Sequence, residues 1–135
     1  MQEFTWPVRV YLEDTDAQGV VYNASYFRFM ERARTEWLRV RGIDHREVQA
    51  RHGIVFVLTE IEARFLAPAR LGDLLDVSAA VVETRGARVV FNQSIRRAQG
   101  GRELLCDGRA QVACMDFAAG KPRRWPNDLL REMTR

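Results

Sequence analysis

The sequence predicts an α+β domain in which a strongly bent antiparallel sheet of about five strands wraps around one long helix. Three observations predict it: one stretch with helical periodicity, a series of strand-like segments joined by tight turns, and a last strand with small residues on one face. With 135 residues, of which 47% are hydrophobic, the chain suits one core better than two. We therefore expect a single domain over residues 1–135.

The first expected element is a strand from Thr5 to Glu13. Val8, Val10 and Leu12 alternate with more polar neighbours, which is the period of a half-buried strand.

The long helix is expected from about Ala24 to Arg41. Asn23 is a good N-cap residue, and Gly42 suits the position that follows a helix end. An apolar stripe recurs at spacings of four and three, formed by Tyr26, Met30, Ala33, Trp37 and Val40.

The rest of the chain is dominated by strand patterns. A short turn or second helix around Asp44–Arg51 comes first. Four strand-like segments bounded by Gly and Pro then follow, over residues 53–66, 74–83, 88–97 and 103–117.

The last of these segments has a face of low volume, made by Cys106, Gly108, Ala110 and Cys114. Such a face lets the helix approach the strand closely. The two cysteines lie about 27 Å apart along an extended strand, which is too far for a disulfide. We expect buried free thiols that behave as small hydrophobic groups.

Charge, composition and sequence motifs exclude several classes of protein. The net charge of +3 comes from arginines spread over several elements and interleaved with acids, without a nucleic-acid-binding motif. No apolar run approaches the ~18 residues of a membrane helix, and the N-terminus lacks a signal-peptide pattern. His45 and His52 have no supporting ligands at metal spacing. We expect a cytoplasmic protein without a membrane span, metal or other cofactor.

The densest acid group of the first half, Glu13, Asp14 and Asp16, lies between the first strand and the helix. Glu13 is interpreted as a strand-end charge and Asp14 as a turn former that binds backbone amides. Asp16 has two interpretations, a turn former or a catalytic carboxylate. Gly19 supplies an unusual backbone conformation or room for a ligand.

The catalytic interpretation depends on the apolar residues Val20-Val21-Tyr22, which pull the loop against the core. Asp16 is then expected in a partly apolar pocket that faces the N-terminus of the helix. Free N–H groups and the positive dipole end at that terminus suit an oxyanion. This combination favours acyl transfer, with the carboxylate as nucleophile or as general base.

Residues 8–26 and 29–36, with the DTDxxGxVYxxxY pattern of residues 14–26, resemble the 4-hydroxybenzoyl-CoA thioesterase family. The likeness is closest to the Tol–Pal-associated acyl-CoA thioesterase subgroup, and it continues through residues 67–73, 85–86, 91–93 and 121–123. It implies a hot-dog fold, homodimers often paired into homotetramers, and active sites at the dimer interface.

The resemblance also implies roles for single residues. Asp16 matches the catalytic aspartate, and the backbone N–H of Asn23 matches the amide that polarises the thioester carbonyl. Gly19, Val20 and Tyr22 belong to the substrate-binding loop. For the phosphates of CoA, Arg70, Arg85 and Arg88 are the expected cations, with plain surface charge as the alternative.

Three positions depart from the subgroup. It usually has His where this chain has Asn23, commonly Gly at Gln18 and often Tyr at Leu12. An amide cannot replace an imidazole as a base near neutral pH. The Asn23 departure therefore predicts chemistry that depends on Asp16, with a slower rate or another acyl preference.

Three functions remain open from the sequence. The first is a thioesterase for small or medium acyl-CoA, with acyl carrier protein as another carrier. The second is a non-catalytic module that binds acyl-CoA or acyl carrier protein. The third, a hot-dog hydratase, lacks the expected Asp/His pattern. The helix acids Glu31 and Glu36 are alternative catalysts, although Glu31 is placed to pair with Arg28 and Glu36 with Arg32.

Overall fold

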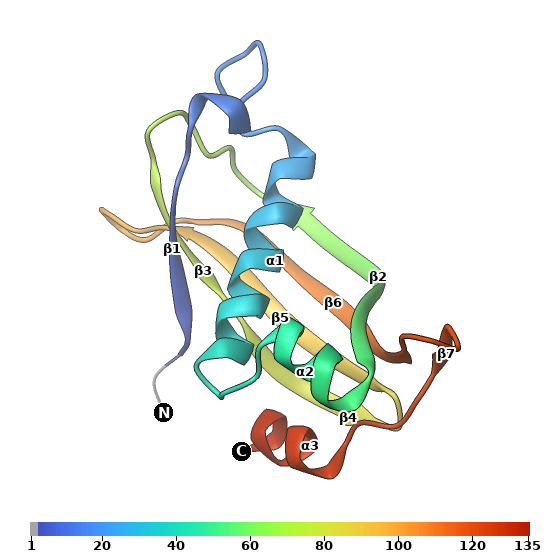
Figure 1. Cartoon of the computed structure of the whole chain (residues 1–135). Helices are drawn as coiled ribbons and strands as arrows, with labels where there is room; N and C mark the ends of the chain where they lie inside the picture. Colours follow the sequence, from blue (N-terminus) through green and yellow to red (C-terminus); the bar gives the residue numbers. More distant parts are fainter. Residues whose placement is uncertain (1–2) are drawn as a thin grey trace.

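The computed structural model describes residues 3–135, so the first two residues of the expected domain lie outside it. A curled antiparallel sheet holds the long helix α1 in its hollow (Figure 1). The elements in chain order are β1 (Thr5–Arg9), the 3-10 turn η1 (Leu12–Asp14), α1 (Asn23–Arg39), α2 (His45–His52), β2 (Ile54–Phe65), β3 (Leu74–Ser78), β4 (Ala80–Arg85), β5 (Arg88–Arg97), β6 (Leu104–Asp116), β7 (Lys121–Pro122) and α3 (Asn127–Thr134).

The sheet follows the strand order β1-β3-β5-β6-β2, and every pairing among the described residues is antiparallel. β4 also pairs with β5, so β3 and β4 follow one another along β5 and are separated at Ala79. The two-residue β7 pairs with the end of β6. The expected bent sheet of about five strands is confirmed, while the expected continuous strand over residues 74–83 is in fact two.

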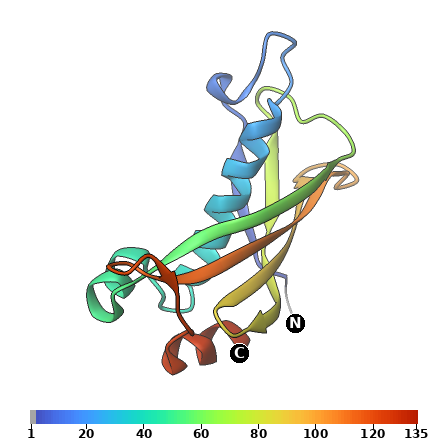
Figure 2. The same ribbon diagram turned by 90° about the vertical axis from the view of Figure 1, so that its right-hand side faces the viewer.

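The helix α1 lies along the hollow side of the sheet (Figure 2). Phe29, Met30, Ala33 and Trp37 are buried there. Trp37 packs edge-on against Phe91 of β5, with ring centroids 5.3 Å apart. Val40, expected in the stripe, is 66% exposed because the helix ends at Arg39.

The small face of β6 permits a close approach, as the sequence predicts. A Cβ atom on Gly108 would lie 2.8 Å from the carbonyl oxygen of Glu62 and 3.1 Å from Cε of Met30. The neighbouring Cys106 and Cys114 are buried and free, which confirms their expected role. Burial raises the pKa of Cys106 to about 12 and that of Cys114 to about 11, so both remain unreactive thiols near neutral pH.

The two ends of α1 differ from each other. Asn23 is the first helical residue and not the cap, because Tyr22 holds the extended cap position; the Tyr22 side chain accepts no bond from the backbone N–H groups of the helix. The expectation for Gly42 is confirmed: it has a φ of +79°, and Ile43 N–H donates to the carbonyl of Leu38 at 3.0 Å. This bond closes the helix end in the way that a left-handed glycine allows.

The first strand is shorter than expected. β1 ends at Arg9, and residues 12–14 form a 3-10 turn that leaves Leu12 75% exposed. The buried Asp14 carboxylate accepts a bond from Tyr11 N–H at 2.8 Å, and Asp14 N–H donates to the Tyr11 carbonyl at 3.0 Å. These local bonds replace a strand ladder, so the alternation up to Glu13 predicted the wrong structure.

The second helix is confirmed close to its expected bounds, and a third was not expected. Asp44 caps α2, its carboxylate accepting from Glu47 N–H at 3.1 Å. α3 buries Leu129 and Met133 against the end of the molecule near β4. None of the helices in residues 3–135 has the length and apolar character that crossing a bilayer requires.

Gly108→Ala tests the close approach of α1 to β6. The added methyl meets a backbone carbonyl that cannot move freely, so we expect a loss of about 1–3 kcal/mol in the free energy of unfolding. Gly101→Ala is the matched control, since a Cβ atom there has no neighbour within 4 Å. Urea titration measures both variants; equal midpoints would show that the packing is looser than described.

Candidate active site

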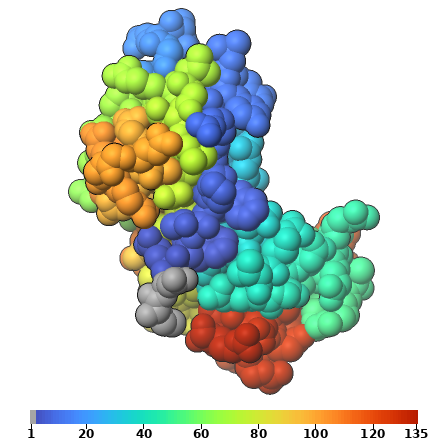
Figure 3. Space-filling model, turned by 90° about the vertical axis from the view of Figure 1, so that its left-hand side faces the viewer, coloured from blue at the N-terminus to red at the C-terminus, as the bar shows by residue number. Residues whose placement is uncertain are grey.

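The loop between β1 and α1 is fastened to the segment of residues 66–72. Val21 N–H donates to the carbonyl of Ala69 at 2.8 Å, and Leu71 N–H to that of Gly19 at 3.4 Å. Ala69 N–H in turn donates to the hydroxyl of Tyr26 on α1 at 3.0 Å. In Figure 3 the loop (blue) and this segment (lime green) form one end of the molecule.

Within the loop, two short extended stretches fold back on each other. Thr15 and Val21 form an antiparallel bridge, and Asp16 N–H donates to the carbonyl of Val20 at 2.9 Å. Gly19 closes the turn with a φ of +78°, a conformation that favours glycine. The turn therefore returns Asp16 to a position beside the residues that enter α1.

The two aspartates of the loop have different surroundings. Asp14 is buried, and its backbone carbonyl accepts from Tyr22 N–H at 3.0 Å, which fixes the entry to the helix. Asp16 is exposed, and its carboxylate accepts a single bond, from Gln18 N–H at 2.8 Å. One chain alone therefore does not build the partly apolar pocket expected around Asp16. Glu13 is exposed, as its structural interpretation predicts.

The start of α1 offers free donors next to this loop. Ser25 N–H donates to the carbonyl of Tyr22 at 2.8 Å, but the N–H groups of Asn23 and Ala24 have no acceptor within residues 3–135. The Asn23 side chain is exposed, and Tyr22 beside it is 57% exposed. These amides and the positive end of the helix dipole can stabilise an oxyanion.

Only one of the three expected phosphate-binding arginines lies beside this loop. Arg70 forms an antiparallel bridge with Val20, and its side chain is exposed. Arg85 and Arg88 lie opposite each other beside the β4–β5 turn. This turn is at the other end of the molecule from the loop between β1 and α1 (Figure 1).

The ion pair between Arg97 and Asp73 was not expected from the sequence. Arg97 also donates to the carbonyl of Pro68 at 3.1 Å, so it braces the segment that holds the loop. Asp73 additionally accepts from Arg70 N–H at 2.8 Å. The only sequence indication was the position of Arg97 at a strand end.

The helix acids pair differently from the sequence expectation. Glu36 pairs with Arg39 at 3.1 Å rather than with Arg32, and Arg28 donates to the Ser25 hydroxyl at 2.9 Å rather than to Glu31. Glu31 instead lines a hollow of about 280 Å³ between α1 and the start of β2.

Polar and apolar side chains share the lining of that hollow. Its walls include Phe56, Leu58 and Phe91, and its polar residues include Arg34 and His45. Burial lowers the pKa of the His45 imidazole, with the Asp44 carboxylate opposing the shift. No group of three or more His, Cys, Asp or Glu side chains in residues 3–135 is arranged to hold a metal ion.

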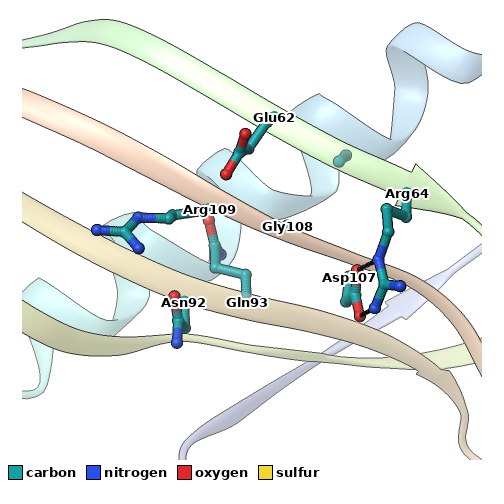
Figure 4. A pocket seen from close by; sticks show the side chains of 8 residues that line it. Glu62, Arg64, Asn92, Gln93, Asp107, Gly108 and Arg109 are labelled. Atoms are coloured by element: carbon teal, nitrogen blue, oxygen red, sulfur yellow. Dashed lines mark hydrogen bonds and ion pairs between the residues drawn. The ribbon is translucent and has the colours of Figure 1, made fainter.

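A larger hollow of about 480 Å³ lies on the outer face of the sheet, with α1 behind it (Figure 4). Arg64 of β2 and Asp107 of β6 form an ion pair there at 2.6 Å. Glu62, Asn92 and Arg109 complete the polar lining. Paired charges and an amide are typical of a solvated surface, and no nucleophile with an adjacent base is present in this lining.

Comparison with known proteins gives a consistent result. Residues 10–133 match the Thioesterase-like superfamily. The acyl-CoA thioester hydrolase YbgC of Escherichia coli O6:H1 is 43% identical over 129 residues, which cover 96% of this chain and 94% of the relative.

Solved structures agree on the fold. A probable thioesterase from Bartonella henselae superposes with a TM-score of 0.83 at 33% identity, covering 93% of this chain and 100% of that one. A 1,4-dihydroxy-2-naphthoyl-CoA thioesterase from Synechocystis has a TM-score of 0.90 at 24% identity, covering 98% and 96% of the two chains. The expected hot-dog fold is thereby confirmed.

Tyr26→Phe tests the attachment of the loop to α1. The buried amide of Ala69 loses its acceptor, so we expect a loss of about 1–3 kcal/mol in the free energy of unfolding. Hydrogen exchange at Ala69 is expected to speed up as well. Tyr22→Phe, whose hydroxyl is exposed, is the control. Unchanged stability and exchange in Tyr26→Phe would mean that the loop does not depend on this bond.

Proposed function

Since the chain belongs to the Thioesterase-like superfamily and is a thioester hydrolase, we propose that it hydrolyses acyl-CoA, with Asp16 and the start of α1 as its catalytic groups. The observation that supports this proposal is that the hairpin carrying Asp16 leads directly into the helix start, where the N–H groups of Asn23 and Ala24 have no acceptor in residues 3–135. The YbgC relative also supports the predicted likeness to the Tol–Pal-associated subgroup.

In the proposed reaction the thioester carbonyl oxygen accepts a bond from Asn23 N–H. Asp16 either takes a proton from the attacking water or attacks the carbonyl carbon itself, giving a mixed anhydride that water then opens. In both routes the C–S bond breaks and the CoA sulfur leaves as a thiolate that takes up a proton. The products are a carboxylic acid and free CoA.

The Asn23 side chain contributes little to this chemistry. It occupies the position where the subgroup usually has His, and an amide does not accept a proton near neutral pH. It is exposed at the helix start and can hold a water molecule or a substrate oxygen. The proposed chemistry therefore depends on Asp16, as base or as nucleophile.

The open edge of β2 supports a dimer. The two edges of the main strand path differ: β1 is five residues long and contains Pro7, whereas β2 has twelve residues and exposes Val57 and Leu58. Proline protects an edge, and a long edge with apolar side chains invites pairing. Two copies related by a two-fold axis would join β2 to β2 in antiparallel fashion.

This dimer would complete the site. The end of β2 lies beside the Asp16 region of its own chain, because Phe65 packs against Tyr26 with ring centroids 5.4 Å apart. Antiparallel pairing sets that end beside the beginning of the partner's β2. The partner would then supply the apolar wall that one chain lacks, through its hollow at Phe56 and Leu58.

The same arrangement would bring the expected phosphate-binding residues together. Arg88 lies opposite Ala113 of β6, and Ala113 lies opposite Val57 near the start of β2. Arg85 and Arg88 of one chain would thus be on the side of the other chain's Asp16 and Arg70. We assign the CoA phosphates to these cations.

The proposal includes four finer predictions from the sequence. They are small or medium acyl chains, acyl carrier protein as a second carrier, pairing of dimers into tetramers, and a cytoplasmic location. A non-catalytic acyl-CoA binder is the alternative function, favoured by the absence of the histidine at position 23.

Asp16→Asn separates the enzyme from the binder. Loss of the only proposed nucleophile or base should lower kcat by about 100-fold or more, with acyl-CoA binding retained. Glu13→Gln, which neutralises an exposed acid three residues away, should leave thiol release unchanged. Thiol release from hexanoyl-CoA measures both. Equal activity of Asp16→Asn and the parent would contradict the proposal, and tight binding without any turnover would favour the binder.

Asn23→Pro tests the backbone donor. Proline is tolerated at the first helical position, and Tyr22 already has the φ of −68° and ψ of 141° that a residue before proline adopts. Removing this N–H should lower kcat by about 100-fold. Asn23→Ala keeps the N–H and should lose far less. If both variants lose the same activity, the side chain and not the amide is the catalytic group.

A further inference from the structure

Arg34 of α1 is a charged side chain in an unusual place. It is 7% exposed, and its Nη1 donates to the Oε1 of Gln93 at 2.9 Å. That amide is fixed, since Gln93 Nε2 donates to the backbone carbonyls of Met30 and Ser78 at 2.9 and 3.1 Å. Arg34 takes part in no ion pair within the described chain, so its positive charge is buried against a neutral amide.

The other guanidinium N–H groups of Arg34 have no acceptor in residues 3–135. Trp125 Nε1 is the only fully enclosed side-chain nitrogen or oxygen of the described residues that lacks a bond. The free Arg34 donors must therefore reach accessible space. Arg34 lines the hollow of about 280 Å³ between α1 and the start of β2, and we take that hollow to be this space.

The hollow has a mixed lining, which includes the polar Thr35 and His45, and it suits an acyl chain with a charged end. Leu38, Phe56 and Phe91 supply apolar walls. Glu31 is exposed and has no contact with Arg34 short enough for an ion pair, so it does not satisfy the guanidinium directly. A carboxylate would satisfy it, because the guanidinium fork binds two carboxylate oxygens and offsets the cost of burying a charge.

We propose that this hollow receives the far end of the acyl group and that Arg34 selects acyl groups ending in a carboxylate, namely CoA monothioesters of dicarboxylic acids. This inference rests on the proposed function. In its own chain Arg34 lies eleven residues from Asn23, or about 16 Å along the helix. The dimer through β2 places the hollow of one chain beside Asp16 of the other, so the site is shared.

Matched substrate pairs test the selection. Adipoyl-CoA and hexanoyl-CoA have equal chain length and differ in the end group, as do suberoyl-CoA and octanoyl-CoA. We expect the parent enzyme to favour the carboxylate member by about tenfold or more in kcat/KM. This ratio corresponds to the free energy of a hydrogen bond to a charged group. A preference for the neutral member in both pairs would overturn the inference.

Variants on one helix assign the preference to Arg34. Arg34→Met should remove it by lowering turnover of adipoyl-CoA about tenfold, with hexanoyl-CoA changed far less. Arg32→Met removes an exposed charge from the same helix and should keep the preference. If Arg34→Met does not fold, the test uses Arg34→Lys in its place. The kcat/KM ratios of the parent for the two substrate pairs are then compared with those of Arg34→Lys. A preference that survives in Arg34→Met or is intact in Arg34→Lys would contradict the role of the guanidinium fork.

The outcomes also distinguish this inference from the proposed function. Absence of turnover with all four thioesters would reject the hydrolase itself. Turnover of hexanoyl-CoA and octanoyl-CoA without a carboxylate preference would reject only the role of Arg34.

Mixed dimers test whether the site is shared. Asp16→Asn and Arg34→Met chains with different tags are co-expressed, and their heterodimers are purified. Such a heterodimer contains one intact site only if each site takes Asp16 from one chain and Arg34 from the other. We expect adipoyl-CoA turnover to rise well above that of either variant homodimer, toward half the parent value per dimer. No rise in purified heterodimers would overturn the shared site.

Discussion

The close packing of α1 against β6 is the constraint on which the rest of the structure depends. Gly108 has no room for even a methyl group beside Met30 and the backbone of β2. The helix can therefore lie deep in the hollow of the sheet, with its apolar stripe buried. Its first turn is fixed beside residues 66–72 through the Tyr26 hydroxyl. The position of the free amides at the helix start follows from this packing.

Once the helix start is fixed, the acidic loop has little freedom. The buried carboxylate and the carbonyl of Asp14 hold the loop at both of its ends, while Asp16 stays at the surface of the turn. Asp14 thus has the structural role, and the proposed chemical role belongs to Asp16. Three features lack a partner in a single chain: the exposed Asp16 carboxylate, the unpaired edge of β2 and the hollow with Arg34. One two-fold pairing of chains would supply a partner for each of them.

Much of the fold could be predicted from the sequence, because helical periodicity and the small face of β6 are local patterns of side-chain size. The 3-10 turn could not, since it depends on where the Asp14 carboxylate bonds. α3 was missed because its eight residues, with Leu129 and Met133 on the buried face, are too few to show a clear helical period. For the site, resemblance indicated Asp16 and Asn23. Arg34 looked like any helix arginine, and only its burial sets it apart.

The most direct test of the central claim is a crystal structure with a CoA ketone in which a methylene group replaces the thioester sulfur. We expect a dimer joined through β2, with the ketone oxygen about 3 Å from Asn23 N–H and the Asp16 carboxylate facing the carbonyl carbon. The acyl group should extend into the partner's hollow. A ligand bound elsewhere, or a carbonyl held away from the start of α1, would contradict the account.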